Sequence, residues 1–591
     1  MSYKAPLEEV LFTLEHIAGI TALSQRPGLE AADPETARAV LTETGRLCEE
    51  VIAPLNAPAD RAPSTWEAGE VTTSAGFKEA WKAYVDGGWP GLSHPEEFGG
   101  QALPKVIGAA AAEMLNAANL SFALCPLLTD GAIEALLTAG SDEMKALYLP
   151  KLIAGTWTGT MNLTEPQAGS DLALLRTRAE RSEDGSYRLF GTKIFITYGE
   201  HDLAENICHL VLARTPDAPA GVRGISLFLV PKFLPDAQGN PGTRNDVHCT
   251  SIEHKLGIKA SPTAVLQFGD QGGATGFLIG EENRGLEYMF VMMNAARFAV
   301  GMQGVAISER ALQQATSYAR ERIQSRPVDG SARESAAIIH HPDIRRLLMK
   351  MRALTEGGRA LAYYAAALND LAHHGEGAET AALYELLVPL VKGFCTENAV
   401  QVASDGIQIH GGMGFIEETG AAQHLRDARI LPIYEGTTAI QANDFLGRKI
   451  LRDSGRTARA LIARIAATEA DLAAGGRAAR DYAVSLGAAR KAFEDALGFS
   501  LEKAGSDPNV AWAGSVPLLM LAGNLVAGWQ LGRGLLAAEA ALSAGGDSAF
   551  LQSRIAVAQF YAAHLLPEAA LQRDRILYGA ASLLALPPET Y

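Results

Sequence analysis

The chain has 591 residues, more than a single compact core holds, so several domains are expected. Hydrophobic residues make up 48% of it and charged residues 20%, a globular composition that excludes a disordered chain. The formal net charge is −16 and the basic residues do not cluster, which argues against nucleic acid or anionic lipid as a partner.

Residues 1–157 are predicted to form a helical domain. Apolar residues recur every three or four positions in the segments 8–20, 35–55 and 109–124. The amino terminus lacks the basic region and the cleavage site of a signal peptide. The five cysteines are scattered, with neither a disulfide pattern nor metal-ligand spacing. A cytoplasmic location is therefore expected.

Residues 158–282 have a different texture. Short β-branched and aromatic runs at 188–197, 209–215, 224–231 and 264–268 are separated by turns rich in Gly, Pro, Asp and Asn. They predict a small β-barrel or sandwich. No helical pattern lies between the runs, which disfavours a βαβ nucleotide-binding fold.

Helical patterns return in residues 283–452, where four long helices are expected to form a bundle. Residues 453–591 are rich in Ala and Leu and predict an extra helical domain. Its most apolar stretch, 516–531, is shorter than the ~20 residues of a membrane span, so we expect a buried helix and no membrane span. The paired histidines at 340–341 and 373–374 are adjacent rather than four apart, so no metal site is predicted.

Two loops could bind a polar ligand. Residues 161–171 offer the hydroxyls of Thr164 and Ser170, with Gly169 allowing close approach, although the same composition suits an ordinary turn. Residues 408–414 contain three glycines, where bare backbone could approach a phosphate or a sugar. They do not match the Rossmann pattern and could equally be a helix-breaking turn.

Glu435 is the candidate catalytic residue. It follows Leu431-Pro432-Ile433-Tyr434, and a carboxylate among apolar neighbours has a raised pKa and can act as a base near neutral pH. Gly436 leaves room for a substrate beside it. The alternative is that Glu435, near Thr437 and Thr438, caps the next helix.

These segments, together with Phe195-Ile196-Thr197 and Arg322, occur in the order and approximate spacing found in the acyl-CoA dehydrogenase family. From about residue 40 to 450 the chain resembles that family closely, most specifically in TEPQAGSD (164–171) and IYEGTT (433–438). The resemblance implies a mainly α fold with a central small β domain: an N-terminal helical domain, a β-barrel and a C-terminal helical bundle. The domain at 453–591 would be an addition.

The resemblance also implies FAD as cofactor and assigns roles to individual residues. Glu435 matches the catalytic base. Arg322 and the 408–412 turn match groups that bind the adenosine diphosphate half of an FAD reaching over from a neighbouring subunit. The implied cofactor contacts are Met161, Leu163, Thr164, Gly169, Ser170, Phe195, Thr197, Arg322, Gln408, Gly411, Gly412, Thr437 and Thr438. The implied substrate contacts are Ser170, Asn294, Arg297 and Gly436.

Two positions depart from the family pattern. Ser325 stands where an aromatic residue is usual, which puts the packing against the adenine half of FAD in doubt. Phe195 stands where Trp is common and still supplies an aromatic face.

The implied reaction converts an acyl-CoA to a trans-2-enoyl-CoA, with the electron-transferring flavoprotein as acceptor and a homo-oligomer, preferably a dimer, as the assembly. The length and the extra domain are similar to those of a longer bacterial subgroup that includes 3-methylmercaptopropionyl-CoA dehydrogenase, of dimethylsulfoniopropionate breakdown. The alternatives are a short- or medium-chain fatty acyl-CoA dehydrogenase, an acyl-CoA oxidase, and a nucleic-acid-associated flavoprotein, which the charge disfavours.

Overall fold

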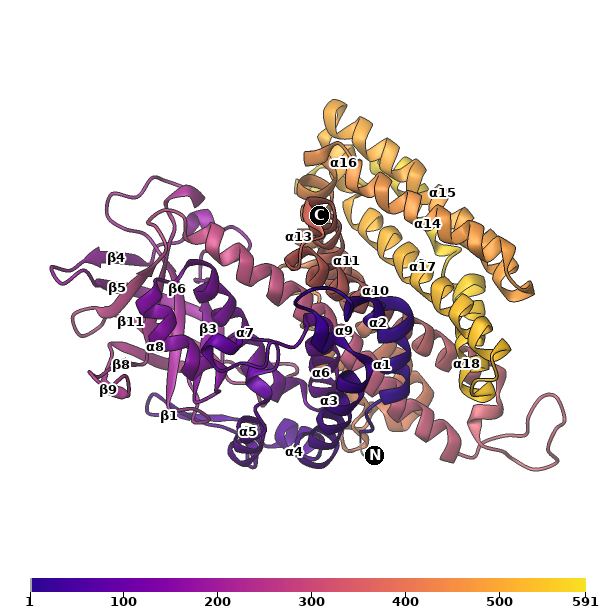
Figure 1. Cartoon of the computed structure of the whole chain (residues 1–591), viewed down its shortest axis with the longest axis horizontal. Helices are drawn as coiled ribbons and strands as arrows, with labels where there is room; N and C mark the ends of the chain where they lie inside the picture. The colour runs from indigo at the N-terminus through magenta and orange to yellow at the C-terminus, as the bar shows by residue number, and fades with distance from the viewer. Residues whose placement is uncertain (1–2, 591) are drawn as a thin grey trace.

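The computed structural model describes residues 3–590; residues 1, 2 and 591, at the ends of the predicted outer domains, lie outside it. A β domain lies at one end, a layer of long helices lies in the middle, and the C-terminal helices cover the far side of that layer (Figure 1). The mainly α fold with a small β domain is confirmed.

The N-terminal part is helical except for one hairpin, β1 (Thr65–Glu67) and β2 (Glu70–Thr72), which the helical periodicity did not predict. Ala68 and Gly69 join its strands with φ of 51° and 93°, the left-handed values of a tight hairpin turn. The helices are α1 Leu7–Thr13, α2 Ile20–Leu23, α3 Pro34–Leu47, α4 Asn56–Arg61, α5 Phe77–Asp86, α6 Lys105–Ala118, α7 Leu120–Ala139 and α8 Asp142–Ile153.

The β domain is built on an eight-stranded sheet in the order β10-β11-β5-β12-β7-β6-β3, with β4 also paired to β5. Only β3 and β6 run parallel; the other paired neighbours are antiparallel. The strands are β3 Trp157–Asn162, β4 Arg178–Arg181, β5 Tyr187–Thr197, β6 Asn206–Ala213, β7 Ser226–Pro231, β8 Phe233–Pro235, β9 Pro241–Arg244, β10 Val247–Ile252, β11 Thr263–Phe268 and β12 Ala274–Ile279. The strands β8 and β9 form a separate pair.

Three long helices form the central layer: α9 (Gly285–Glu321), α10 (Pro342–His373) and α11 (Gly377–His410). The predicted fourth long helix is wrong. Residues 411–450 instead contain short turns, α12 (Ala421–Ala428), α13 (Thr438–Asn443) and a π-helical turn at 444–450. Glycine and proline interrupt the helical pattern here.

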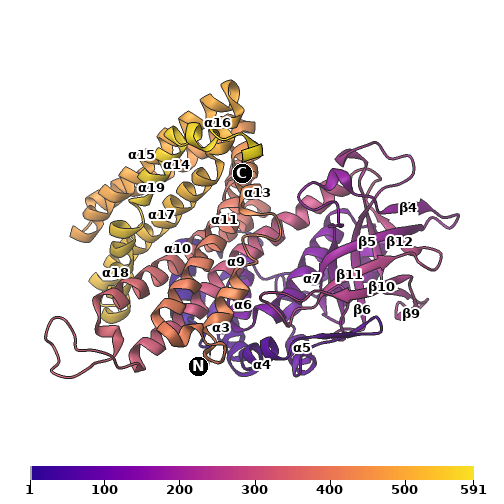
Figure 2. The ribbon, with the colours of Figure 1, turned by 180° about the vertical axis from the view of Figure 1, so that it is seen from behind.

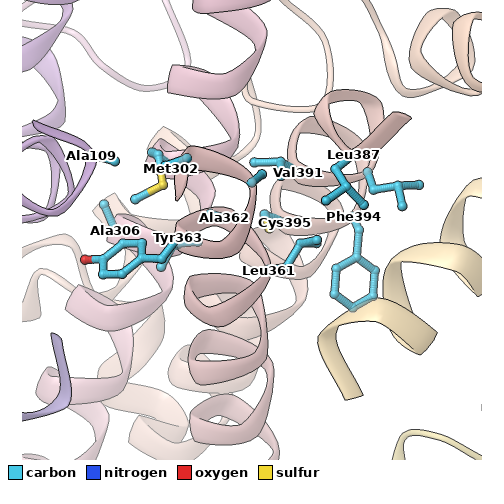
Figure 3. Packing of buried hydrophobic residues seen from close by; sticks show 14 of the residues in the cluster. Ala109, Met302, Ala306, Leu361, Ala362, Tyr363, Leu387, Val391, Phe394 and Cys395 are labelled. Carbon is cyan, nitrogen blue, oxygen red and sulfur yellow. The ribbon is translucent and has the colours of Figure 1, made fainter. Parts of the chain in front are cut away.

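The C-terminal helices pack against α10 and α11 without a gap. A Cβ on Gly393 of α11 would lie 2.7 Å from the side chain of Leu519, and one on Gly523 would lie 2.5 Å from Phe394, so glycine lets these helices approach closely. Figure 3 shows Phe394 directed away from Tyr363, toward the C-terminal helices. Figure 2 shows the same helices from behind, lying along α10. They are α14 Arg456–Ala474, α15 Arg477–Ser506, α16 Pro508–Ala513, α17 Ser515–Ser543, α18 Ser548–His564, α19 Glu568–Tyr578 and α20 Ala580–Leu583.

Among residues 3–590, two helices, α7 and α9, are long and apolar enough to cross a membrane by composition alone, but 78% and 61% of their most apolar windows are buried inside the protein. The stretch at 516–531 lies within α17, most of which is buried, as expected from its sequence.

Candidate active site

Glu435 lies on a tight turn between α12 and α13. Its φ is 53° and that of Gly436 is 89°, so two successive residues have left-handed backbone. For a residue with a side chain this conformation costs roughly 1 to 2 kcal/mol, so surrounding contacts must maintain it. Thr437, not Glu435, caps α13, because its hydroxyl accepts the Ile440 N–H at 3.3 Å. The capping role is therefore taken, and Glu435 is free for another.

Helix α11 supplies several of the contacts that hold this turn. The buried ammonium of Lys392 donates to the carbonyls of Leu431 at 2.8 Å and Gly436 at 2.7 Å. One turn further along α11, Glu397 accepts the Thr438 hydroxyl at 2.5 Å. The Gln441 amide donates to the Glu435 and Gly436 carbonyls at 3.2 and 3.1 Å.

Protein surrounds most of the Glu435 carboxyl group, yet part of the residue's surface remains accessible. Burial raises its pKa above the ordinary 4.5, and the positive charges of Lys392 and Arg297 oppose this rise. Arg297 is itself buried and paired with Asp444 at 3.2 Å. Within residues 3–590 no side chain donates a hydrogen bond to the Glu435 carboxylate. The group is thus balanced by two cations while its oxygens remain available.

A chain of buried polar side chains begins at the residue before Glu435. The Tyr434 hydroxyl donates to the Gln303 amide oxygen, and the Gln303 amide nitrogen donates to Asn116 at 3.2 Å. Gln303 is on α9 and fully buried, and Asn116 is on α6. These bonds connect the turn to the interface between the N-terminal helices and the bundle.

The structure brings together the predicted cofactor residues of the β domain. Ile194 of β5 donates to the carbonyl of Thr164 at 3.0 Å, which sets the 161–170 loop beside Phe195 and Thr197. Lys193 donates to the Leu163 carbonyl and to Glu165 at 3.0 and 2.8 Å. Phe195 has φ 60° and is 59% exposed, so its ring projects from the sheet.

A buried ion pair underlies that loop. Glu165 accepts the Lys193 ammonium, the Thr177 hydroxyl at 2.5 Å and the Arg176 N–H at 2.8 Å. Its pKa falls to about 2: burial acts to raise it, and the charge of Lys193 and these hydrogen bonds outweigh that effect. The pair fixes the loop as an ionised unit. Of the other loop residues, Met161 is buried in β3 while Gly169 and Ser170 are exposed.

The predicted nucleotide-binding elements lie elsewhere. Tyr318 of α9 stacks on His410 of α11 with ring centroids 4.4 Å apart, which brings Arg322 and the 408–412 turn to one end of the bundle. From Lys392, beside the catalytic turn, to Gly411 is about 28 Å along α11 at ~1.5 Å per residue. A single protomer therefore does not gather all the predicted cofactor contacts in one place.

The predicted substrate contacts are also only partly gathered. Asn294 and Arg297 are three residues apart on α9 and so lie on one face of that helix. Gly436 adjoins Glu435, and the positive charge of Arg297 lowers the pKa of the Glu435 carboxyl group. Ser170 lies exposed on the loop after β3, and within residues 3–590 no hydrogen bond links it to α9.

Comparison with known proteins accounts for nearly the whole chain. Sequence models of the acyl-CoA dehydrogenase N-terminal, middle and C-terminal domains match residues 34–156, 160–271 and 283–450. A fourth, acetyl-CoA dehydrogenase C-terminal like, matches residues 461–587. The chain is 59% identical to a 3-methylmercaptopropionyl-CoA dehydrogenase of Ruegeria pomeroyi over 99% of both chains.

The chain belongs to the acyl-CoA dehydrogenase family. It is an FAD-dependent oxidoreductase that dehydrogenates acyl-CoA thioesters. The acyl-CoA dehydrogenase of Bacillus anthracis, solved in complex with FAD, matches with a TM-score of 0.71 and 25% identity over 85% of this chain and 83% of that one. An acyl-CoA dehydrogenase of Caenorhabditis elegans, solved in complex with C11-CoA, shares the fold over 98% of this chain and 95% of its own, with a TM-score of 0.78 and 21% identity.

The side chains of this acyl-CoA dehydrogenase fit FAD. Phe195 offers an exposed aromatic face beside the hydroxyl of Thr197. The exposed guanidinium of Arg322 forms no ion pair within residues 3–590, and a Cβ on Gly411 or Gly412 would meet only open space. A free cation beside accessible glycine backbone suits a diphosphate.

Some residues around the site were missed in the sequence. The Glu165–Lys193 pair, Lys392 and the Gln303–Asn116 pair support the loop or the turn and were not singled out. A charged or amide residue within an otherwise apolar helical stretch was the available signal, as in Leu390-Val391-Lys392.

Proposed function

We propose that this enzyme oxidises 3-methylmercaptopropionyl-CoA to methylthioacryloyl-CoA, with Glu435 as the base. The observation that carries the assignment of the base is the Glu435 carboxylate, which lies on a left-handed turn, desolvated, balanced by cations and unbonded at its oxygens. The substrate is proposed from the 59% identity to a dehydrogenase of that name over 99% of both chains.

Glu435 takes the proton from the carbon α to the thioester, and the electron pair of that C–H bond forms the double bond to the β carbon. The hydrogen of the β carbon leaves as hydride, with the electron pair of its own C–H bond. FAD, when bound, supplies the hydride acceptor. The raised pKa of Glu435 suits this step, because a base of higher pKa captures the weakly acidic α proton more readily. The Glu435 N–H is proposed to stabilise the charge that develops on the thioester oxygen, an effect typically of ~3 to 4 kcal/mol.

A short acyl group suits the surroundings of the base. Tyr434 is anchored to Gln303, which in turn bonds to Asn116, so the interior next to Glu435 is occupied by hydrogen-bonded side chains. A long alkyl chain directed there would break these bonds and leave buried polar groups unpaired, at a cost of about 1 to 3 kcal/mol for each group.

We propose the electron-transferring flavoprotein as acceptor, a homodimer as the assembly and the cytoplasm as the location. The dimer is supported by the separation of Arg322 and the glycine turn from Glu435. Phe415, 85% exposed, and Ile323, 59% exposed, lie beside that turn and beside Arg322, and association would cover them.

Substrate preference is tested with a panel of acyl-CoAs and an artificial electron acceptor. We expect kcat/KM to be highest for the methylthio compound and lower for butanoyl-, hexanoyl- and octanoyl-CoA. Hydrogen peroxide is measured in the same assays, and its formation in step with turnover would indicate an oxidase. Equal or better rates with the straight-chain substrates would overturn the thioether assignment.

The base is tested by Glu435→Gln. We expect the variant to fold and retain yellow bound flavin, while kcat falls by at least about 10⁴-fold, because an amide cannot accept the proton. The matched control is Glu385→Gln, which changes an acid of α11 that pairs with Lys449 at 2.8 Å. Turnover by Glu435→Gln at the wild-type rate is incompatible with its role as base.

A further inference from the structure

Lys392 is a fully buried lysine on α11 that contacts the turn at Glu435. Its ammonium donates to a carbonyl on each side of the base, that of Leu431, four residues before it, and that of Gly436, directly after it. The two acceptors belong to one short loop, so a single group holds both of its ends at 2.7 to 2.8 Å.

The turn needs such a contact, because Glu435 has φ 53° and Gly436 has φ 89°. A left-handed conformation at a residue with a side chain persists only where its surroundings fix it. The Gln441 amide also contacts the turn, but at 3.1 to 3.2 Å and on the Glu435 and Gly436 carbonyls only. The Thr438 N–H also closes the turn, by donating to the Pro432 carbonyl at 3.0 Å, and Lys392 ties both Leu431 and Gly436 to α11.

We propose that Lys392 is a positioning residue for the base: its ammonium ties Leu431 to Gly436 and thereby sets the direction of the Glu435 carboxylate. This inference rests on the proposed role of Glu435. It predicts that loss of the ammonium impairs proton transfer while acyl-CoA binding, made elsewhere along the substrate, is retained.

Charge adds a second effect. The charged groups that act on Lys392 are Glu435 of the turn, Arg297 of α9 and Glu397 of its own helix. Burial lowers the pKa of Lys392 to about 7, and Glu435 counteracts that fall. Reciprocally, Lys392 lowers the pKa of Glu435, which burial raises. Without the ammonium, Glu435 should hold its proton to higher pH.

The test compares Lys392→Met, which keeps the length of the side chain and removes donors and charge, with Lys392→Arg, which keeps both. Lys350→Met is the matched control. Lys350 is a partly buried lysine of α10, and it pairs with Asp405 of α11, about 20 Å along that helix from Lys392. Flavin content, KM, kcat from pH 5 to 9, and amide hydrogen exchange of residues 431–441 are measured on each flavin-loaded enzyme.

We expect Lys392→Met to lose about 100-fold in kcat with KM changed less than about threefold, because a small misplacement of a reacting group has an effect of that size. The acidic limb of its kcat–pH profile should move to higher pH by about one unit, and amide hydrogen exchange in residues 431–441 should become faster. Lys392→Arg should recover most of the rate, and Lys350→Met should match the wild type. Wild-type kcat, limb and exchange in Lys392→Met overturn the proposal.

If Lys392→Met does not fold, Lys392→Gln decides, because its amide is one bond shorter and uncharged, so it cannot tie both carbonyls as the ammonium does. An upward shift of its acidic limb with faster exchange supports the proposal, and an unchanged limb and exchange overturn it. Failure of the base assignment is distinguishable: there Glu435→Gln itself stays active, whatever the Lys392 variants do.

Discussion

Two buried ionic clusters lie in the same helical layer, and they differ in how completely they are paired. Arg359 donates to Glu113 through Nε at 2.9 Å and Nη2 at 2.6 Å, and to Glu309 at 2.8 Å. The Tyr363 hydroxyl donates to Glu113 at 2.7 Å. At the other cluster, the Glu435 carboxylate faces Lys392 and Arg297 without a hydrogen bond from either.

The difference separates a structural cluster from a reactive one. The carboxylate of Glu113 has its oxygens engaged by Arg359 and Tyr363, so its neighbours hold it in place. Lys392 donates to backbone carbonyls, and Arg297 is paired with Asp444. Glu435 therefore has two positive charges nearby but receives no hydrogen bond from either. A half-buried carboxylate with free oxygens can take a proton from a ligand.

Arg359→Met gives the largest effect expected from this comparison. It leaves Glu113 and Glu309 buried without their cation, a loss of about 3 to 5 kcal/mol for a buried pair. With an unfolding entropy of about 2.1 cal/mol/K per residue, the melting temperature of a 591-residue chain should fall by about 2 to 4 °C. The activity per folded, flavin-loaded molecule should remain within about twofold.

The control for that change is Arg346→Met on the same helix. Arg346 is half-exposed and pairs with Asp343, and such an exposed ion pair contributes little to the free energy of unfolding. Calorimetry and kcat are measured on both. An Arg359→Met enzyme that melts like the control, or that loses turnover while fully folded, would erase the distinction between the two clusters.

The pH dependence of kcat/KM sharpens the comparison at Glu435. Its pKa lies above the ordinary 4.5 because of burial, and only the deprotonated form is a base. The rate should therefore fall about tenfold per pH unit below that pKa and reach a plateau above it. Lys392, with its pKa of about 7, titrates as a coupled partner of Glu435.

This profile is measured at constant ionic strength with saturating acceptor, on enzyme whose flavin content is checked at each pH. The Arg359→Met enzyme should keep the same acidic limb, because its cluster does not contain the base. A rate that does not vary between pH 4.5 and 8 would show that no raised carboxyl pKa controls the reaction.

Gln303→Ala should give a smaller change, in substrate range. Removal of this side chain releases Tyr434 and frees space beside the turn, so kcat/KM for hexanoyl-CoA relative to butanoyl-CoA should rise about tenfold, near the effect of burying two further CH₂ groups. Gln313→Ala, which changes a half-buried side chain on the same helix that bonds to Lys4, should leave the ratio unaltered. An unchanged ratio in Gln303→Ala would remove the polar chain as a determinant of acyl length.

Sequence patterns predicted the helical and β regions because periodicity depends on which face of each element is buried, as at 188–197 and 264–268. They failed at the hairpin of β1 and β2 and at the expected fourth long helix, where turns override the pattern. The resemblance located Glu435. Its support by Lys392 was not predictable, because that contact joins residues about 40 positions apart and depends on how α11 faces the turn.

Neighbouring residues of α11 serve two different parts of the molecule. Lys392 faces the catalytic turn, while Gly393 and Phe394 lie against α17. A chain shortened at residue 452 would therefore expose a broad apolar face of α11, on the side opposite to Lys392. Such a fragment would be prone to aggregate and to loosen that helix. In this enzyme the additional domain completes the packing of the helix that supports the catalytic turn, rather than being a detachable module.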